Sequence, residues 1–239
     1  MKKDYADYLL KYSMEVYDDI AVQFSKTRNG FWSDLNFLID YAKSGLKILD
    51  LGCGNGRLLN ALKDKEVQYV GVDNSEKLLS EAQKNYPEYK DKFWKADALN
   101  LPFAENEFDM IYSIAVLQHI PSKEYRMKFL KECLRTLKKD GKLVLTVWLV
   151  KNGSNHYKKA NNIFQRVKSL LKLSDFDYGD VMIPFVVDNV NLGDRYIHAF
   201  SLKELVWLVR KAGFKLIDGG YTKDGLGKKR NIYIVASKY

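Results

Sequence analysis

The sequence contains few of the features that mark secreted or membrane proteins. Its 239 residues include only two cysteines, and Cys53 and Cys133 lie 80 residues apart, so neither a disulfide framework nor a zinc site is expected. The longest apolar run, residues 143–150, is far shorter than the ~20 residues that span a bilayer. Residues 1–5 lack the apolar stretch of a secretory signal. We therefore expect a protein without a membrane anchor, in a reducing, cytoplasmic compartment.

A net excess of one charge sign is nearly absent from the first part of the chain and marked in the last. Residues 1–150 hold 23 Lys and Arg against 22 Asp and Glu, whereas residues 151–239 hold 16 against 8. A basic region of this kind attracts the phosphates of nucleic acids. Solvated lysines on exposed helices would give the same composition, so charge alone leaves nucleic-acid binding open.

Apolar periodicity predicts helices first and then an alternation of strands and helices. Residues 1–45 have helical spacing, with a connecting turn at 25–30. From residue 46 the pattern predicts strands and helices in turn, which indicates a parallel sheet covered on both faces. The expected strands are 46–51, 67–72, 92–96, 108–113, 141–149, 214–221 and 231–237. The expected helices are 56–65, 75–85, 123–138, 161–173 and 202–212.

A glycine-rich turn follows the first predicted strand. Residues 48–56 read Ile-Leu-Asp-Leu-Gly-Cys-Gly-Asn-Gly, and Asp73 ends the next predicted strand. Such a turn lets the backbone approach a nucleoside ligand, and an acid on the second strand can take the ribose hydroxyls. The spacing differs from the G-x-G-x-x-G of dinucleotide sites, and no Gly-Lys-Ser/Thr of a P-loop follows. Asp50, beside the turn, would repel a pyrophosphate but suits a cationic amino-acid moiety.

This motif resembles the D/E-x-G-x-G-x-G motif of the class I S-adenosylmethionine (SAM) methyltransferases. The resemblance implies a Rossmann-like α/β fold with seven mostly parallel strands, the last antiparallel, and SAM as the cofactor. It implies no metal. It divides the single domain 1–239 into an N-terminal helical segment (1–45), a SAM-binding core (46–150), a substrate-side insertion (151–195) and a C-terminal helix and hairpin (196–239). The cofactor-binding residues that it implies are Tyr17, Asp50, Gly52, Gly54, Asn55, Gly56, Asp73, Asn74, Asp97, Ala98 and Ser113.

Further segments are similar to one branch of that class, the eukaryotic-type wobble-uridine tRNA methyltransferases. These segments are Val-Tyr-Asp-Asp-Ile-Ala at 16–21, Phe-Ser-Lys-Thr-Arg at 24–28, Trp32, Ala-Asp-Ala-Leu-Asn-Leu-Pro at 96–102, 113–116 before His119, and Arg-Tyr-Ile-His-Ala-Phe at 195–200. The resemblance covers about residues 14–215. The chain departs from the branch at Gln118, where relatives often have histidine, and at 224–230, a basic loop.

Members of this branch methylate the carboxylate of 5-carboxymethyluridine in the tRNA anticodon. The resemblance implies that Arg28 and Arg195 face the anionic acceptor or its phosphates, because arginine can grip either in a bidentate way. It implies that His119 and His198 orient the acceptor. Eukaryotic members work with a small zinc-bearing activator protein, so a small activator subunit is a possible partner besides tRNA.

Two other functions are compatible with the same motifs. The class I core also serves small metabolites such as quinone precursors, amines and carboxylic acids, since fold does not fix substrate. A non-catalytic SAM-binding subunit is the third alternative, although the complete glycine motif and both cofactor acids argue against it.

Overall fold

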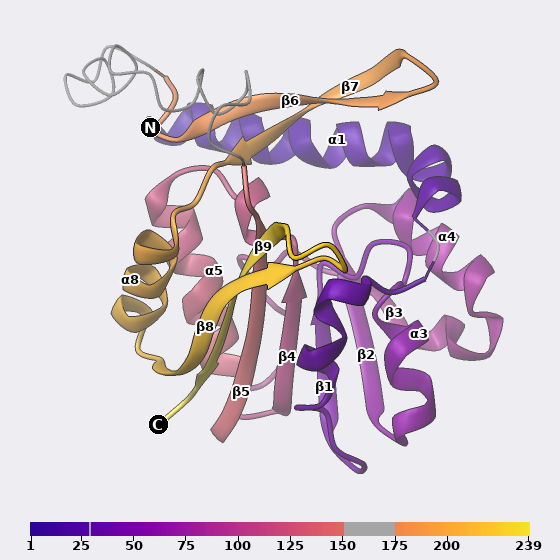
Figure 1. The fold of residues 1–239 in the computed structure, drawn as a ribbon, viewed down its shortest axis with the longest axis vertical. Helices are drawn as coiled ribbons and strands as arrows, with labels where there is room; N and C mark the ends of the chain where they lie inside the picture. Colours follow the sequence, from indigo (N-terminus) through magenta and orange to yellow (C-terminus); the bar gives the residue numbers. More distant parts are fainter. Residues whose placement is uncertain (29, 151–174) are drawn as a thin grey trace.

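A seven-stranded sheet forms the centre of the molecule (Figure 1). We analysed a computed structural model, which describes residues 1–28, 30–150 and 175–239. The strand order is β3-β2-β1-β4-β5-β9-β8, and only β9 runs antiparallel to its neighbours. The predicted α/β class is therefore confirmed. The strands are β1 (Lys47–Leu51), β2 (Gln68–Asp73), β3 (Phe93–Lys95), β4 (Phe108–Ile114), β5 (Leu137–Trp148), β8 (Lys215–Lys223) and β9 (Lys229–Ser237).

Two apolar cores cover the two faces of this sheet. In β1, Ile48 belongs to one core while Leu49 and Leu51 belong to the other, as expected when successive side chains of a strand point to opposite faces. Helices α5 and α8 pack in one core, and α2, α3 and α4 in the other. The helices are α1 (Lys3–Thr27), α2 (Asn36–Ile39), α3 (Leu59–Leu62), α4 (Glu76–Asn85), α5 (Lys123–Thr136) and α8 (Leu202–Ala212), with short 3-10 turns η1 (Ser33–Leu35), η2 (Lys63–Lys65), η3 (Pro87–Lys92) and η4 (Leu117–His119).

A second, two-stranded sheet lies beside α1, across the carboxyl ends of the parallel strands of the main sheet (Figure 1). It is the hairpin of β6 (Asp180–Val187) and β7 (Val190–His198). Asp188 and Asn189, the two residues between the strands, both have positive φ, as tight hairpin turns require. The sequence pattern did not predict this hairpin. The boundary placed between 195 and 196 falls inside β7 and must move beyond His198.

Some predicted element boundaries differ from the structure. The helix expected at 56–65 is shorter, because Gly56 has φ +83 and cannot continue a helix; α3 and η2 occupy 59–65. The turn expected at 25–30 begins later, since α1 continues to Thr27, whose hydroxyl bonds back to the Gln23 carbonyl. The helix expected at 161–173 lies outside the described residues.

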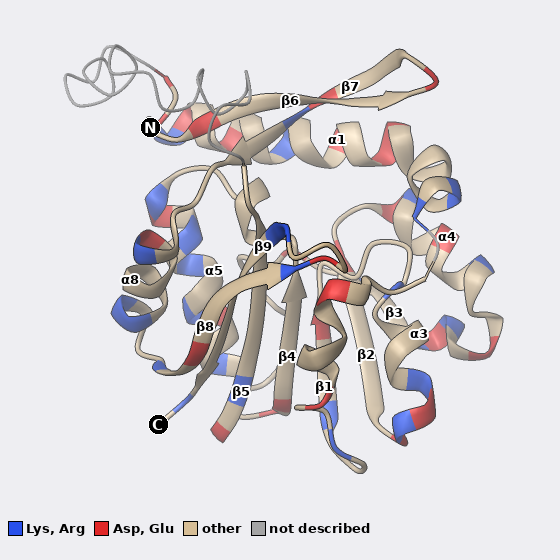
Figure 2. Cartoon of the chain, in the orientation of Figure 1, with Lys and Arg blue, Asp and Glu red and all other residues tan. Residues whose placement is uncertain are grey.

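Basic side chains are spread over the helices and the β8–β9 loop rather than confined to one described face (Figure 2). On that loop, Arg230 pairs with Asp224 at 2.6 Å. In the described part of the chain, no helix combines the length and hydropathy needed to cross a bilayer. Among the described residues, no group of three or more His, Cys, Asp or Glu is arranged so that it could hold a metal ion.

Candidate active site

The glycine turn leaves β1 in a conformation that only glycine adopts easily. Gly52 has φ +78, and its N–H donates to the Val72 carbonyl of β2 at 2.8 Å. A Cβ added there would lie 2.3 Å from Val116 Cγ2 in the loop after β4. Gly52 therefore lets two loops meet at the carboxyl ends of β1 and β4, which is where ligands bind in such sheets.

Asp73, at the end of β2, holds the turn from the other side. Its carboxylate accepts the Gly54 N–H at 2.9 Å and the Ser75 N–H at 3.0 Å. Asn55 links the turn to the end of α1, because its amide donates to Ser25 Oγ and to the Arg28 carbonyl, both at 3.3 Å. The turn is thus fixed before any ligand arrives.

Asp50 is a buried acid at the base of the turn. Its carboxylate accepts the Tyr69 hydroxyl at 2.7 Å. Burial raises the pKa of Asp50 to about 7, although the Tyr69 hydrogen bond opposes the shift. The carboxyl is therefore about half-ionised at neutral pH, and a cation placed beside it would favour the ionised form.

A cavity of about 1250 Å³, including its open mouth, lies over these strand ends. Most of the predicted site residues line it: Tyr17, Arg28, Asp50, Gly52, Gly54, Asn55, Asp73, Asn74, Asp97, Ala98 and His119. Four do not. Gly56 packs against the Tyr86 ring, Ser113 is fully buried within β4, Arg195 stacks on Trp148 of the cavity wall, and His198 is buried away from the cavity.

This lining fits a SAM molecule. The glycine turn shares one cavity with Asp50, Asp73, Asp97 and Ala98, the residues that the resemblance implies for the amino-acid, ribose and adenine moieties. One carboxylate oxygen of Asp97 accepts a hydrogen bond from the Leu99 N–H at 2.8 Å. SAM, when bound, supplies a methyl group on a positively charged sulfur.

His119 is held as a neutral ring with one defined tautomer. Its Nδ1 lies 3.0 Å from the Tyr196 carbonyl, which can only accept, so Nδ1 carries the proton. Its Nε2 therefore accepts the Tyr17 hydroxyl at 3.0 Å. Burial, together with the charge of Arg195, lowers the pKa of His119 to about 4. His119 is thus a positioned acceptor for Tyr17 at neutral pH, and not a free base.

Two arginines converge on the Phe185 ring of β6 beside this histidine. The Arg28 guanidinium lies 5.5 Å from the ring centroid and that of Arg195 lies 5.1 Å from it. Arg195 is only 6% exposed and also stacks on Trp148 at 5.0 Å. Burial and the charge of Arg195 lower the pKa of Arg28. Among the described residues no carboxylate lies within 4 Å of either guanidinium, and Arg195 Nε and Nη1 have no hydrogen-bond partner.

His198 does not reach the cavity, contrary to the expectation that it orients the acceptor. Its ring nitrogens face Asp180 at 2.7 Å and Glu204 at 2.9 Å, and the residue is 2% exposed. The Arg-Tyr-Ile-His segment is a strand, so Arg195 and His198 stand three residues apart and point to opposite sides.

Two residues of the cavity wall, Trp148 and Arg57, were not predicted as site residues. Trp148, at the end of β5, packs edge-on against His119. Arg57 stacks on Trp32 with its guanidinium 3.5 Å from the ring centroid, and it bonds to the Gly30 carbonyl. Trp148 could have been suspected, because the carboxyl end of a parallel strand is a ligand position. Arg57 follows the glycine turn directly but has no periodic signal.

Comparison with known proteins shows which family has this fold and site. The family model described as "Methyltransferase domain" matches residues 49–145. A putative methyltransferase of Encephalitozoon cuniculi is 31% identical over 88% of this chain and 90% of its own length. The tRNA (carboxymethyluridine(34)-5-O)-methyltransferase of Schizosaccharomyces pombe is 29% identical over 97% of this chain and 98% of its own. The chain matches only 24% of the length of the corresponding Xenopus tropicalis enzyme, at 35% identity over 63% of this chain.

Solved structures show the same fold at lower identity. A SAM-dependent methyltransferase of Methanosarcina mazei superposes with a TM-score of 0.65 at 22% identity, over 87% of this chain and 98% of its own. A structure described as a complex of the Haloferax volcanii Trm112 methyltransferase activator with a putative methyltransferase matches with a TM-score of 0.65 at 17% identity, over 94% of this chain and 96% of that one. With its sheet order, glycine turn and strand-end acids, this chain belongs to the class I SAM-dependent methyltransferases.

Proposed function

We propose that this protein methylates the carboxylate of a carboxymethyl-type modified wobble uridine in tRNA. The observation that carries the proposal is the pair of arginines, Arg28 and Arg195, beside His119 and the cofactor cavity, with no described carboxylate as partner. A buried cation requires an anion to balance it, and arginine matches a carboxylate with two parallel hydrogen bonds. The name of the Schizosaccharomyces pombe relative agrees with such an acceptor.

The mechanism follows from the charges around the cavity. A carboxylate is ionised at pH 7, so no proton has to be removed before it attacks the methyl carbon. Arg28 and Arg195 would hold the acceptor oxygen in line, and the apolar rings of Trp148 and Phe185 would keep water from it. Tyr17, whose hydroxyl donates to His119, also lines this cavity.

The pH dependence of turnover tests this mechanism. Because the pKa of His119 is about 4 and a carboxylate acceptor ionises near 4, we expect kcat at saturating SAM to stay flat between about pH 5.5 and 8. An amine or hydroxyl acceptor that needs a base would instead give a rate rising with pH. A rising limb with an apparent pKa near 6.5 would contradict both the neutral histidine and the carboxylate acceptor.

SAM binding has its own expected pH dependence, set by Asp50. Its pKa of about 7 means that binding an ammonium group beside it releases a proton, so affinity increases as Asp50 ionises. We expect the Kd for SAM, measured by calorimetry, to fall roughly fivefold to tenfold between pH 6 and 7.5. Asp50→Asn should abolish the dependence, and Tyr69→Phe should move it to higher pH. A Kd independent of pH in the unaltered protein would contradict this role.

The experiment for the function itself is transfer of labelled methyl from SAM to total tRNA, half of it pretreated with mild alkali. Alkali hydrolyses existing methyl esters and exposes carboxylates, so we expect strong labelling of treated tRNA and little of untreated tRNA. A second alkaline treatment should release the label, because the product is an ester. Each assay is run with and without a co-purified activator of the Trm112 type, since a small activator subunit is part of the proposal. No alkali-labile labelling in any arm would overturn it.

A small-metabolite acceptor is the second candidate, and one observation favours it. Tyr17 and other residues of α1 line the cavity together with Trp148, as in a pocket that closes over a small ligand. The same tRNA assay separates the two candidate functions, because a metabolite enzyme would label a small-molecule extract and leave tRNA unlabelled.

We place the protein in the cytoplasm, where tRNA is modified.

A further inference from the structure

Strand β7 contributes to the active site from outside the main sheet. Its Tyr196 carbonyl fixes the His119 ring, and the adjacent Arg195 stacks on Trp148. Yet β6 and β7 form a separate sheet, with no ladder to the seven-stranded one. The position of β7 over the cavity therefore depends on side-chain contacts.

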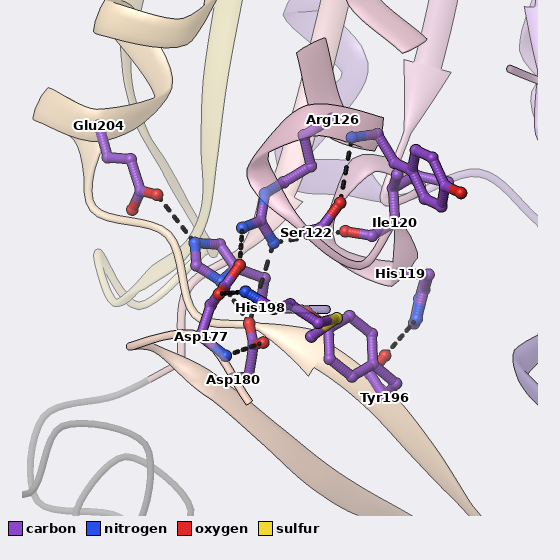
Figure 3. Close-up of polar contacts among 11 residues, drawn as sticks. His119, Ile120, Ser122, Arg126, Asp177, Asp180, Tyr196, His198 and Glu204 are labelled. Carbon is purple, nitrogen blue, oxygen red and sulfur yellow. Dashed lines mark hydrogen bonds and ion pairs between the residues drawn. The ribbon is translucent and has the colours of Figure 1, made fainter. Parts of the chain in front are cut away.

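One buried group of charged side chains lies where the hairpin meets the helices (Figure 3). It comprises Arg126 of α5, Asp177 and Asp180 beside and in β6, His198 of β7, and Glu204 of α8, and we call it the hairpin anchor. His198 bridges Asp180 at 2.7 Å and Glu204 at 2.9 Å. The Arg126 guanidinium lies 3.5 Å from Asp177 and 3.9 Å from Asp180. Four elements, α5, β6, β7 and α8, are thus joined through ion pairs.

His198 is the doubly protonated member of this group. A carboxylate oxygen faces each ring nitrogen, so both nitrogens donate and the ring carries a positive charge. Burial and the charge of Arg126 would lower the pKa of His198, but the two carboxylates outweigh them and raise it. The ring is therefore held at both edges.

The hairpin anchor also contacts the loop that carries His119, the other partner of the His119–Tyr196 hydrogen bond. Arg126 Nη1 donates to the carbonyl of Ile120, the residue after His119, at 3.3 Å. On the hairpin side, His198 stands two residues after Tyr196 on the same strand. Both partners of the bond that sets the His119 tautomer are thus tied to one ionic group, as Figure 3 shows.

We propose that Arg126, Asp180, His198 and Glu204 are positioning residues, which hold β7 against the His119 loop so that the Tyr196 carbonyl fixes the His119 tautomer and Arg195 faces the acceptor. Buried ion pairs contribute little net stability compared with apolar residues of the same volume, so geometry is the better account of this group. The positioning of His119 stands without the proposed acceptor, whereas the effect on turnover rests on the proposed function.

The test is nitrogen-15 NMR of the histidine side chains. The chain has three histidines, so the ring signals are few and can be assigned by substitution. In the unaltered protein we expect His119 as the Nδ1-protonated tautomer down to about pH 5, and His198 as an imidazolium. In His198→Gln, we expect His119 to become a mixture of tautomers with its pKa moved from about 4 toward 6.5.

Kinetics complete the test. In His198→Gln, methyl transfer to alkali-treated tRNA should fall about tenfold to a hundredfold in kcat, because small displacements cost this much, while the Kd for SAM stays within about twofold. Glu204→Leu, at the half-exposed end of the anchor, is the milder variant if His198→Gln does not fold. Glu107→Leu is the matched control, since it breaks the Lys47 ion pair at the amino-terminal ends of β1 and β4, opposite the strand ends that form the cavity.

The NMR arm decides the proposal without any acceptor. A folded His198→Gln or Glu204→Leu protein whose His119 tautomer and pKa match those of the unaltered protein would overturn it. The same shift in Glu107→Leu would also overturn it, because the effect would then be a general loss of stability. Failure of tRNA labelling with the NMR shift present would count against the acceptor and not against the anchor.

Discussion

Arg195→Met should lower kcat/KM for the carboxylate acceptor by about 100-fold or more, while the Kd for SAM changes by less than about twofold. Arg195 is only 6% exposed, and its guanidinium lies between Trp148 and Phe185 with two nitrogens that have no partner among the described residues. Losing a buried, charge-assisted contact to an anion costs about 2–5 kcal/mol, which is roughly 30-fold to several thousandfold. Methionine has a similar volume and is apolar, so the fold should tolerate it. Steady-state methyl transfer to alkali-treated tRNA measures the effect.

Three variants make the Arg195 result specific. Arg195→Lys keeps the charge but loses the planar pair of donors, so it should recover only part of the rate. Arg28→Met should affect the acceptor in the same sense, because both guanidinium groups flank Phe185. Arg210→Met removes an exposed arginine of α8 and should change nothing. Unchanged kcat/KM in Arg195→Met would remove the anion site from the mechanism.

Gly52→Ala should weaken SAM binding by about 100-fold or more, the largest effect expected on the cofactor. The added Cβ would stand 2.3 Å from Val116 Cγ2 and 2.9 Å from Cγ1, far inside contact distance. Val116 is β-branched and has little rotamer freedom with which to move aside. The φ of +78 adds about 1–2 kcal/mol of backbone strain for any residue with a Cβ. The loops that carry Gly52 and Val116 must therefore separate. Calorimetric titration with SAM measures the loss of affinity.

Two variants separate the clash from the strain. Gly45 also has positive φ, +82, but a Cβ there would meet no atom within 4 Å. Gly45→Ala should therefore cost some stability and leave the Kd for SAM unchanged. The double substitution Gly52→Ala with Val116→Ala removes the clashing atoms and should recover part of the affinity. A single Gly52→Ala protein that binds SAM normally would show that the loops need not approach this closely.

Local pattern was enough for the core of the fold and for bringing the predicted glycines and acids to the strand ends. The alternation of apolar runs with helical segments predicted the parallel sheet, since burial on both faces requires that composition. Spacing placed Gly52, Gly54, Asp50 and Asp73 at strand ends, and the structure brings these residues to one cavity. These features depend on residues close together in the chain, so the sequence carries them directly.

What pattern could not provide was the pairing of distant segments. The β6–β7 hairpin was not predicted. The sides of β7 to which Arg195 and His198 point were therefore not predicted either. The strand period of two sends them in opposite directions, one toward Trp148 and one toward Glu204. A motif read as one functional block is thus divided between the active site and the hairpin anchor.

The sequence by itself determined the fold class, the SAM-binding turn and the presence of a histidine after the fourth sheet strand. Only the tertiary structure decided the protonation state and the tautomer of that histidine. His119 is neutral, with its proton on Nδ1, because Tyr196 lies 77 positions away in sequence and Tyr17 lies 102 away, yet each is 3.0 Å from the ring. Protonation and tautomer depend on burial and on the partner of each nitrogen, and the fold alone supplies both.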